Sequence, residues 1–456
     1  MSGEAPPVPA ATASLDEAAV GAVLDDLHTF RHRYWAPALL GFIMLFDSWD
    51  SIAIAYVMPT LSAEWHLSPL VMGYIISAGY GGQFIGAVTL GMVAERLGRL
   101  PVFILATSVM CVLAIACAMA TSYGQLFVLR AIQGVAIGGA MPVAITYVNE
   151  LAPTRLRGRY FGLFQTLAIS GFAVASLSSP IVVPHLGWRW MFGLGALPIV
   201  LLPLVWLTLP ESPRWLARIG RLEQANRALT KLGGGPAAFT GGPASGAVTQ
   251  KLNMNPLVLF KAPLTTRSIK ITALWFLTMF TSFGLTTWVP SIYVKVFHIP
   301  VERALSIAAV TAVAIFLALA TAGFMIDRFG RRPFAIGGLS ITASTLLIFA
   351  AVQPETESVL VGLIMAGQIA MFYGAFLVWP LTAENYPTDV RALALGYGSS
   401  IGRGASMLTP IFVGFVLARG APIAIVFGIF GLFALGAMLI WLLGTRETAG
   451  KPLDTI

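Results

Sequence analysis

The chain has 456 residues, of which 57% are hydrophobic and only 11% are charged, and its mean hydropathy is +0.82. Soluble proteins carry roughly 25% charged residues. This chain therefore cannot cover a globular surface with charge, and its composition excludes an ordinary soluble protein. The two cysteines, Cys111 and Cys117, lie in one apolar run and form neither a disulfide framework nor a metal-site pattern. We expect no metal and no cofactor.

Twelve apolar segments are long enough to cross a bilayer, since a spanning helix needs about 20 mainly apolar residues. Six of them precede a polar gap at 210–268 and six follow it. The first 30 residues lack the basic start and apolar core of a signal peptide. The predicted spans lie near 35–59, 69–94, 101–121, 124–151, 158–184, 190–209, 269–294, 304–326, 333–352, 358–384, 391–418 and 422–444.

The polar gap divides the chain into two halves. It contains the run KLGGGPAAFTGGPASGAVTQK, whose glycines and prolines are typical of a flexible linker. We therefore expect an all-α integral membrane protein with twelve transmembrane helices in two six-helix bundles. The predicted divisions are a tail at 1–30, an N-terminal bundle at 31–209, a central loop at 210–268, a C-terminal bundle at 269–444 and a tail at 445–456.

The basic residues predict the orientation. Loops on the cytoplasmic side of a membrane carry an excess of Lys and Arg. If both termini lie inside the cell, the outer loops hold only Arg189, Lys295, Arg303 and Arg419. Both termini are therefore expected in the cytoplasm, and the chain is expected to be a multi-pass protein of the cell inner (plasma) membrane. The net charge of +8 then has a topogenic role, which excludes nucleic acid as a partner.

The two halves repeat each other. The stretch Gly91–Arg99 (GMVAERLGR) matches Gly323–Arg331 (GFMIDRFGR) with an offset of 232, and Glu150 matches Glu384 with an offset of 234. Elements in the same order with so small a drift indicate a duplicated six-helix unit. Parallel repeats of this kind place a substrate site near the bilayer midplane, between the halves.

The repeated loops, together with Arg130-x-x-Gln133-Gly134 and PESPRWL at 210–216, make the chain similar to the major facilitator superfamily over about 33–454. The resemblance implies alternating access, in which two six-helix bundles rock about a central site. It also implies that the loops act at the cytoplasmic gate, although Glu95 stands where the family usually has Asp. The predicted gating residues are Gly91, Glu95, Arg96, Arg99, Asp327, Arg328 and Arg331.

Four ionisable residues lie well inside predicted spans, namely Asp47, Asp50, Arg130 and Arg403. A charge at membrane depth is costly unless it is paired or hydrated, so it usually marks a substrate or ion pathway. Asp50 follows Asp47 by three residues, so the two carboxylates share one helical face. Arg403 lies at a similar depth in the other half. These residues predict one central cavity, and the alternative is an ion pair that only locks helices together.

Asp50 and Arg130 resemble the acid of helix one and the arginine of helix four in proton-coupled sugar porters. The resemblance implies that Asp50 couples transport to protons, with Arg130 as its partner and Asp47 as a second acid. A neighbouring arginine favours the ionised carboxylate, and desolvation opposes it. A cavity that opens alternately to two solutions can switch that balance.

The D-x-x-D pair of the first span, TTWVP at 286–290, the turn at 386–391 and Gly402-Arg403-Gly404 resemble a narrower group. This group comprises the aromatic acid:proton symporters and the nicotinate-type metabolite:proton symporters. The resemblance implies import of a small organic anion, an aromatic monocarboxylate such as a benzoate- or nicotinate-type acid. Arg403 offers a planar fork for a carboxylate, aromatic rings can wall the site, and glutamines either line it or bond across helices. The predicted substrate-binding residues are Arg403, Trp49, Trp288, Tyr373, Trp379, Gln165 and Gln368.

Other functions fit the sequence less well. An enzyme is excluded, because the G-x-S-x-G match at 398–402 has no histidine inside a span to serve as its base. A sugar:proton symporter is favoured by PESPRWL, but span seven lacks the glutamines that such porters use for hydroxyl groups. A drug:proton antiporter and a non-transporting membrane receptor of the same fold stay open. The expected partners are a small organic-anion substrate, protons and membrane lipid, and we expect a monomer.

Overall fold

The computed structural model describes residues 19–26, 34–237 and 256–445. The elements in these ranges are all helical, and eleven helical spans are long and apolar enough to cross a membrane. The helix Pro69–Leu97 has 29 residues and is the twelfth long element. Each of the twelve predicted spans corresponds to one of these elements, which confirms the all-α architecture. The tails at 1–30 and 445–456 and the Gly- and Pro-rich run fall mostly outside the described residues.

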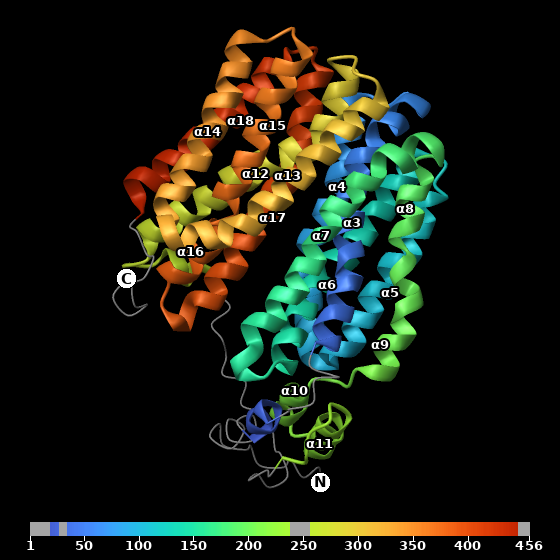
Figure 1. The fold of residues 1–456 in the computed structure, drawn as a ribbon, viewed down its shortest axis with the longest axis vertical. Helices are drawn as coiled ribbons and strands as arrows, with labels where there is room; N and C mark the ends of the chain where they lie inside the picture. The colour runs from blue at the N-terminus through green and yellow to red at the C-terminus, as the bar shows by residue number, and fades with distance from the viewer. Residues whose placement is uncertain (1–18, 27–33, 238–255, 446–456) are drawn as a thin grey trace, which may run out of the picture.

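The helices form two bundles, drawn in blue to green for the N-terminal half and in yellow to red for the C-terminal half (Figure 1). The N-terminal bundle contains α3 (Trp35–Glu64), α4 (Pro69–Leu97), α5 (Arg99–Ala118), α6 (Tyr123–Leu151), η1 (Thr154–Leu156), α7 (Arg157–His185) and a sixth span built from α8 (Arg189–Gly195), η2 (Leu197–Leu201) and α9 (Leu202–Thr208). The C-terminal bundle contains α12 (Thr265–Lys295), α13 (Val301–Phe329), α14 (Arg331–Val352), α15 (Glu357–Phe376), α16 (Val378–Asn385), α17 (Thr388–Ala418) and α18 (Ile423–Gly444).

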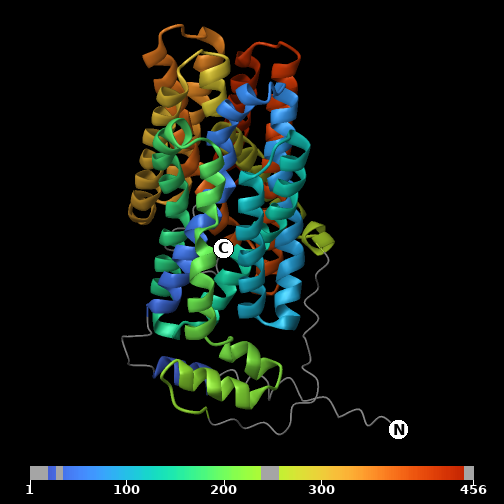
Figure 2. The same ribbon diagram turned by 90° about the vertical axis from the view of Figure 1, so that its right-hand side faces the viewer.

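Between the bundles the chain forms α10 (Pro213–Arg218), α11 (Leu222–Lys231) and η3 (Pro256–Phe260). Helices α10 and α11 lie beneath the N-terminal bundle (Figure 2), and we call this end of the molecule the linker end and the opposite end the far end. A short helix at 19–25 packs against them through Val20 and Leu24, which join an apolar cluster around Trp215.

Local sequence explains where the helices begin. The hydroxyl of Ser68 accepts a bond from the N–H of Val71 at 3.4 Å, with Pro69 in the first helical turn of α4. Glycines make the two equivalent loop turns, with φ of 104° at Gly98 and 87° at Gly330. These are backbone conformations that L side chains rarely adopt, so the repeated motif glycines are required by the turn itself.

Helix α3 is the most enclosed span. In the most apolar 18-residue stretch of α3, 89% of the residues are buried, whereas 33–56% are buried in the corresponding stretches of the other ten candidate spans. A helix that is apolar around its whole circumference belongs inside a protein rather than at its surface. The helix that carries both buried carboxylates therefore lies at the centre, where it contacts α7 of its own bundle and α12 of the other.

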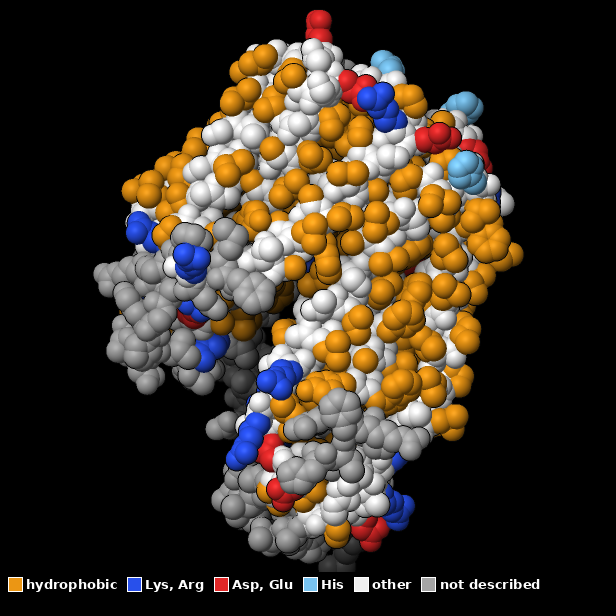
Figure 3. Space-filling view, viewed as in Figure 1, with side chains coloured by type: hydrophobic (Ala, Val, Ile, Leu, Met, Phe, Trp, Pro, Cys, Tyr) orange, Lys and Arg blue, Asp and Glu red, His pale blue; other side chains and the backbone are white. Residues whose placement is uncertain are grey.

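The bundles join at the far end and separate toward the linker end. The largest apolar core includes residues of both bundles, such as Trp188 and Trp288. By contrast, the cores nearer the linker end each belong to one bundle. Figure 3 shows the molecule hollowed between the bundles on this side. The structure is therefore open toward the linker end and closed toward the far end.

Three hydrogen bonds between described residues join the bundles. At the far end, Lys295 donates to the carbonyl of Leu67 at 3.3 Å, and further in, Ser77 donates to the carbonyl of Met407 at 2.6 Å. The third involves Arg403, near the middle of its helix. Helices α4 and α17 also cross closely, because a Cβ placed on Gly73 would lie 3.3 Å from the Cα of Ile411. Glycine at this crossing lets the far end close.

Candidate functional site between the two bundles

A cavity of about 250 Å³ lies between the bundles, lined by α3 and α7 from one side and by α12, α13, α15 and α16 from the other. Its wall is predominantly apolar, as is typical of sites for small molecules. The aromatic side chains among its lining residues are Tyr56, Phe172, Phe283, Phe316, Phe372, Phe376 and Trp379.

Few polar groups face this cavity. The hydroxyls of Ser282 and Thr286 donate to carbonyls of their own helix, at 3.4 and 2.7 Å, so they contribute little free hydrogen-bonding capacity. Gln368 is 7% exposed and lines the cavity, and it has no hydrogen-bond partner among the described residues. Its amide is therefore available to a bound molecule.

Asp50 lies behind this cavity in a fully enclosed polar cluster. Asp50 and Gln133 are 0% exposed and Arg130 is 2% exposed. The amide of Gln133 donates to Oδ2 of Asp50 at 3.0 Å. Arg130 donates to the main-chain carbonyl of Asp50 at 3.1 Å and to Oε1 of Gln133 at 2.8 Å. Arg130 thus meets Asp50 at the backbone, and Gln133 contacts the carboxylate.

The packing around Asp50 leaves room for the carboxylate and little else. A Cβ placed on Gly195 of α8 would lie 2.6 Å from Oδ1 of Asp50, so the glycine creates the space that this oxygen occupies. The Oδ1 atom itself has no hydrogen-bond partner among the described residues. The neighbouring Trp49 donates to the carbonyl of Met191 at 2.7 Å, which ties α3 to α8.

Arg403, Gln83 and Ser51 form a second polar cluster, which spans the two bundles and lies near Asp47. Arg403 of α17 donates to Oε1 of Gln83 at 3.4 Å, and Gln83 donates to the hydroxyl of Ser51 at 3.4 Å. Asp47 is 5% exposed and is close enough to Arg403 for their charges to interact. Within the described part of the chain, Oδ1 of Asp47 and Nε of Arg403 have no hydrogen-bond partner, so both groups retain capacity for a ligand.

The predicted substrate residues fall in different places. Gln368 and Trp379 line the cavity, and the ring of Trp379 meets that of Trp275 edge-on at 4.7 Å. Trp288 is 1% exposed in the shared far-side core, and Tyr373 packs edge-on against Phe334. The residues that are not part of the cavity wall are Arg403, Trp49, Trp288, Tyr373 and Gln165.

Sequence reasoning missed most of the cavity wall. Tyr56, Phe172 and Phe283 line it, yet with 28 phenylalanines in an apolar chain nothing in the sequence distinguishes them from lipid-facing rings. The sequence did contain a signal for the contact between Gln133 and Asp50. Gln133 follows Arg130 by three residues, which places both side chains on one helical face.

The repeated loop motifs form equivalent ion pairs at the linker end. In the N-terminal bundle Arg99, only 1% exposed, pairs with Glu150 at 3.0 Å and with Glu95 at 2.7 Å. In the C-terminal bundle Arg331 pairs with Glu384 at 2.8 Å. The residues that match between the two halves of the sequence, Arg99 with Arg331 and Glu150 with Glu384, therefore also form matching ion pairs in the structure.

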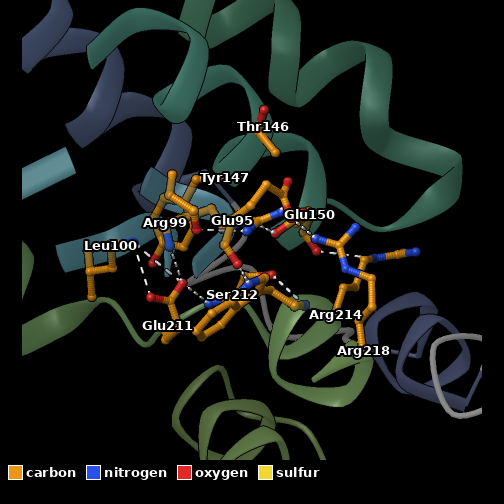
Figure 4. Close-up of polar contacts among 12 residues, drawn as sticks. Glu95, Arg99, Leu100, Thr146, Tyr147, Glu150, Glu211, Ser212, Arg214 and Arg218 are labelled. Atoms are coloured by element: carbon orange, nitrogen blue, oxygen red, sulfur yellow. Dashed lines mark hydrogen bonds and ion pairs between the residues drawn. The ribbon is translucent and has the colours of Figure 1, made fainter. Parts of the chain in front are cut away.

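The linker helices attach to the first of these motifs (Figure 4). Glu211 accepts bonds from the backbone N–H groups of Arg99 at 3.1 Å and Leu100 at 3.2 Å, which caps the start of α5. Arg218 of α10 pairs with Glu95 at 2.6 Å. Burial raises the pKa of Glu211, and the N–H groups that it accepts from oppose the rise.

The remaining gating residues lie nearer the surface. Arg96 and Arg328 have exposed side chains, and a Cβ placed on Gly91 would have nothing within 4 Å. The side chain of Asp327 lies outside the described part of the chain. The arginines that pair with Glu150 and Glu384 are thus the last residue of each motif rather than the middle one.

Comparisons with known proteins agree with this architecture. A family described as "Sugar (and other) transporter" matches residues 30–456. A niacin transporter of Acinetobacter baylyi is 29% identical over 439 residues, covering 95% of this chain and 98% of the relative. A gallate transporter of Pseudomonas putida is 32% identical over 416 residues, covering 89% and 90%. The crystal structure of a D-xylose–proton symporter has a TM-score of 0.70 at 20% identity, covering 92% of this chain and 99% of that one.

These matches confirm the predicted superfamily, the fold and the exclusion of an enzyme. The helical spans and the transporter relatives also agree with the multi-pass inner-membrane location that was expected. The chain belongs to the sugar (and other) transporter family of the major facilitator superfamily.

Proposed function

We propose that this transporter imports a small aromatic monocarboxylate together with protons. The observation that carries the substrate class is the cavity between the bundles, whose walls are aromatic and apolar and include the amide of Gln368. Such a wall suits an aromatic ring better than a polyhydroxylated sugar, because each sugar hydroxyl would need a hydrogen-bond partner. The relatives named for niacin and gallate carry compounds of this aromatic carboxylate class.

Arg403 is proposed to bind the substrate carboxylate. Its neighbour Gly402 packs on Met279, because a Cβ at Gly402 would lie 2.9 Å from Met279 Cγ, and Met279 lines the cavity. The guanidinium makes one long bond, to Gln83 at 3.4 Å, and its Nε is unpartnered among the described residues. A guanidinium with free donors can hold a carboxylate through two parallel charge-assisted bonds. Movement of α17 against α12 would bring the guanidinium of Arg403 to the wall of the apolar cavity.

Asp50 is proposed to carry the coupling proton, with Asp47 as a second acid. Both carboxylates are almost completely enclosed, and an enclosed negative charge without a direct ion pair is costly at membrane depth. Taking up a proton removes that cost, so the protonated carrier can close around a dry site more easily. Substrate movement is then tied to the protonation state of Asp50.

The linker end is proposed to be the cytoplasmic gate. Loops rich in Lys and Arg lie at this end, which favours a cytoplasmic location, and the structure then represents the inward-open state. The ion pairs Arg99–Glu150 and Arg331–Glu384 stabilise the helix ends that would meet when the gate closes. Lys295 and Ser77 tie the bundles at the outer side.

Uptake by purified protein in liposomes tests this function. With an inward proton gradient, labelled benzoate and nicotinate should accumulate, and collapse of the gradient should abolish accumulation. Benzamide, nicotinamide and xylose serve as matched neutral compounds and should not accumulate. Accumulation of xylose would favour the sugar symporter, gradient-driven extrusion of a lipophilic cation would favour the drug antiporter, and binding without uptake would favour a receptor.

A further inference from the structure

Gln133 stands between the two charged residues of the enclosed cluster. Arg130 reaches the backbone carbonyl of Asp50 at 3.1 Å, whereas the side-chain amide of Gln133 reaches the carboxylate at 3.0 Å. The same amide accepts from Arg130 at 2.8 Å through its oxygen. The hydrogen-bonded link between the guanidinium and the carboxylate therefore runs through one glutamine side chain, which is itself 0% exposed.

The orientation of this amide is determined by its other partners. Its oxygen accepts from Arg130 and lies 3.8 Å from Sγ of Cys117, and its nitrogen donates to the carbonyl of Met110 at 3.3 Å. A flipped amide would place its oxygen against the Met110 carbonyl and its N–H groups against a guanidinium, which has only donors. An N–H of Gln133 therefore always faces Asp50.

We infer that Gln133 is a positioning residue that sets the pH at which Asp50 takes up its proton. The inference rests on the proposed role of Asp50 in coupling. A fixed N–H donor stabilises the ionised carboxylate, because the donor binds a charged oxygen more strongly than the oxygen of the neutral acid. Hydrogen bonds to charged groups are about twice as strong as neutral ones, so loss of this donor should favour the protonated acid.

Other groups around Asp50 also influence its protonation equilibrium, and these groups are left unsubstituted when Gln133 is changed. Arg130 also lies over the ring of Phe192, with its Cζ 5.6 Å from the ring centroid, which holds the guanidinium in place. Within the described part of the chain, the titratable and charged groups close enough to interact electrostatically with Asp50 or Arg130 are Asp47 on α3, Tyr80 on α4, Cys111 and Cys117 on α5, and Asp50 and Arg130 themselves.

The test measures the pH profile of gradient-driven benzoate uptake in liposomes for Gln133→Met and Gln133→Glu. Met removes both functions of the amide, while Glu is nearly isosteric and keeps the acceptor for Arg130 but replaces the donor. Both variants should move the half-maximal pH upward by about one unit, which corresponds to a tenfold higher proton affinity. Gln125→Met, a change of the same type at an exposed position of α6, should leave the profile unchanged.

A purely structural role would lower uptake at every pH and leave the half-maximal pH in place, and that result in both variants would overturn the inference. Infrared titration of the protonated carboxyl band that disappears in Asp50→Asn gives a second readout that needs no transport. If Asp50→Asn still accumulates benzoate, the coupling proposal fails by itself. The infrared midpoint in Gln133→Met, which adds no carboxyl group of its own, then decides the role of Gln133, since an unchanged midpoint refutes it and an upward shift supports it.

Discussion

The glycine crossing at the far end predicts a substitution that should change the conformational equilibrium without touching the site. In Gly73→Ala, the new Cβ would overlap the carbonyl oxygen of Pro410 and would lie 3.1 Å from the carbonyl carbon of Pro410 and 3.3 Å from Cα of Ile411, all backbone atoms of the other bundle. This conflict exists only while the far end is closed. Overpacking costs about 1–3 kcal/mol, and about 1.4 kcal/mol is a tenfold change in an equilibrium constant. The ratio of molecules open at the far end to molecules closed there should therefore rise roughly 5- to 150-fold.

The distance between spin labels at the far end measures this shift. Met119 and Val352 are exposed positions, 71% and 67%, at the far ends of α5 and α14 in opposite bundles. Labels on cysteines at these positions, with the two native cysteines replaced, should show a longer distance component in Gly73→Ala. Gly162→Ala has nothing within 4 Å of its new methyl group and is the matched control. If Gly73→Ala and the control give the same distance distribution, the reasoning from the close crossing is wrong.

Four further predictions concern the site and the gate. Asp50→Asn imitates the protonated acid, so it should retain benzoate exchange across liposomes but lose accumulation driven by a pH gradient; retained accumulation would contradict the coupling role. Arg403→Lys should weaken benzoate binding about tenfold by calorimetry, because an ammonium cannot form the bidentate fork, and an equal loss of benzamide binding would refute carboxylate recognition. Gln368→Leu should change the relative uptake of nicotinate and benzoate, since it removes the free amide of an apolar wall; an unchanged ratio would place Gln368 outside recognition. Arg99→Ala should lower the free energy of unfolding by about 3 kcal/mol, measured by thermal unfolding, mainly because it leaves the largely buried Glu150 without its partner. Glu95→Ala should lower it far less, because the side chain of Glu95 is more exposed.

The sequence by itself determined the membrane class, the twelve spans and the duplication. Each of these depends on local composition, because a span must supply about 20 apolar residues in one run and a repeated motif is visible along the chain. The enclosed carboxylates Asp47 and Asp50 could also be identified, since a charge inside an apolar run is conspicuous without any knowledge of its neighbours. Equivalence of the Arg99 and Arg331 loops followed from their constant offset.

Only the tertiary structure decided which side chains meet. Asp50 and Gln133 are 83 residues apart, and their contact depends on how α3 and α6 are rotated against each other. The same rotation turns Trp49 toward α8 and leaves Tyr56 of the same helix on the cavity wall. In a helix that is apolar on every side, no hydrophobic stripe marks the face that a neighbour covers. The rotation of each helix, and with it the composition of the site, is therefore determined by packing between distant segments.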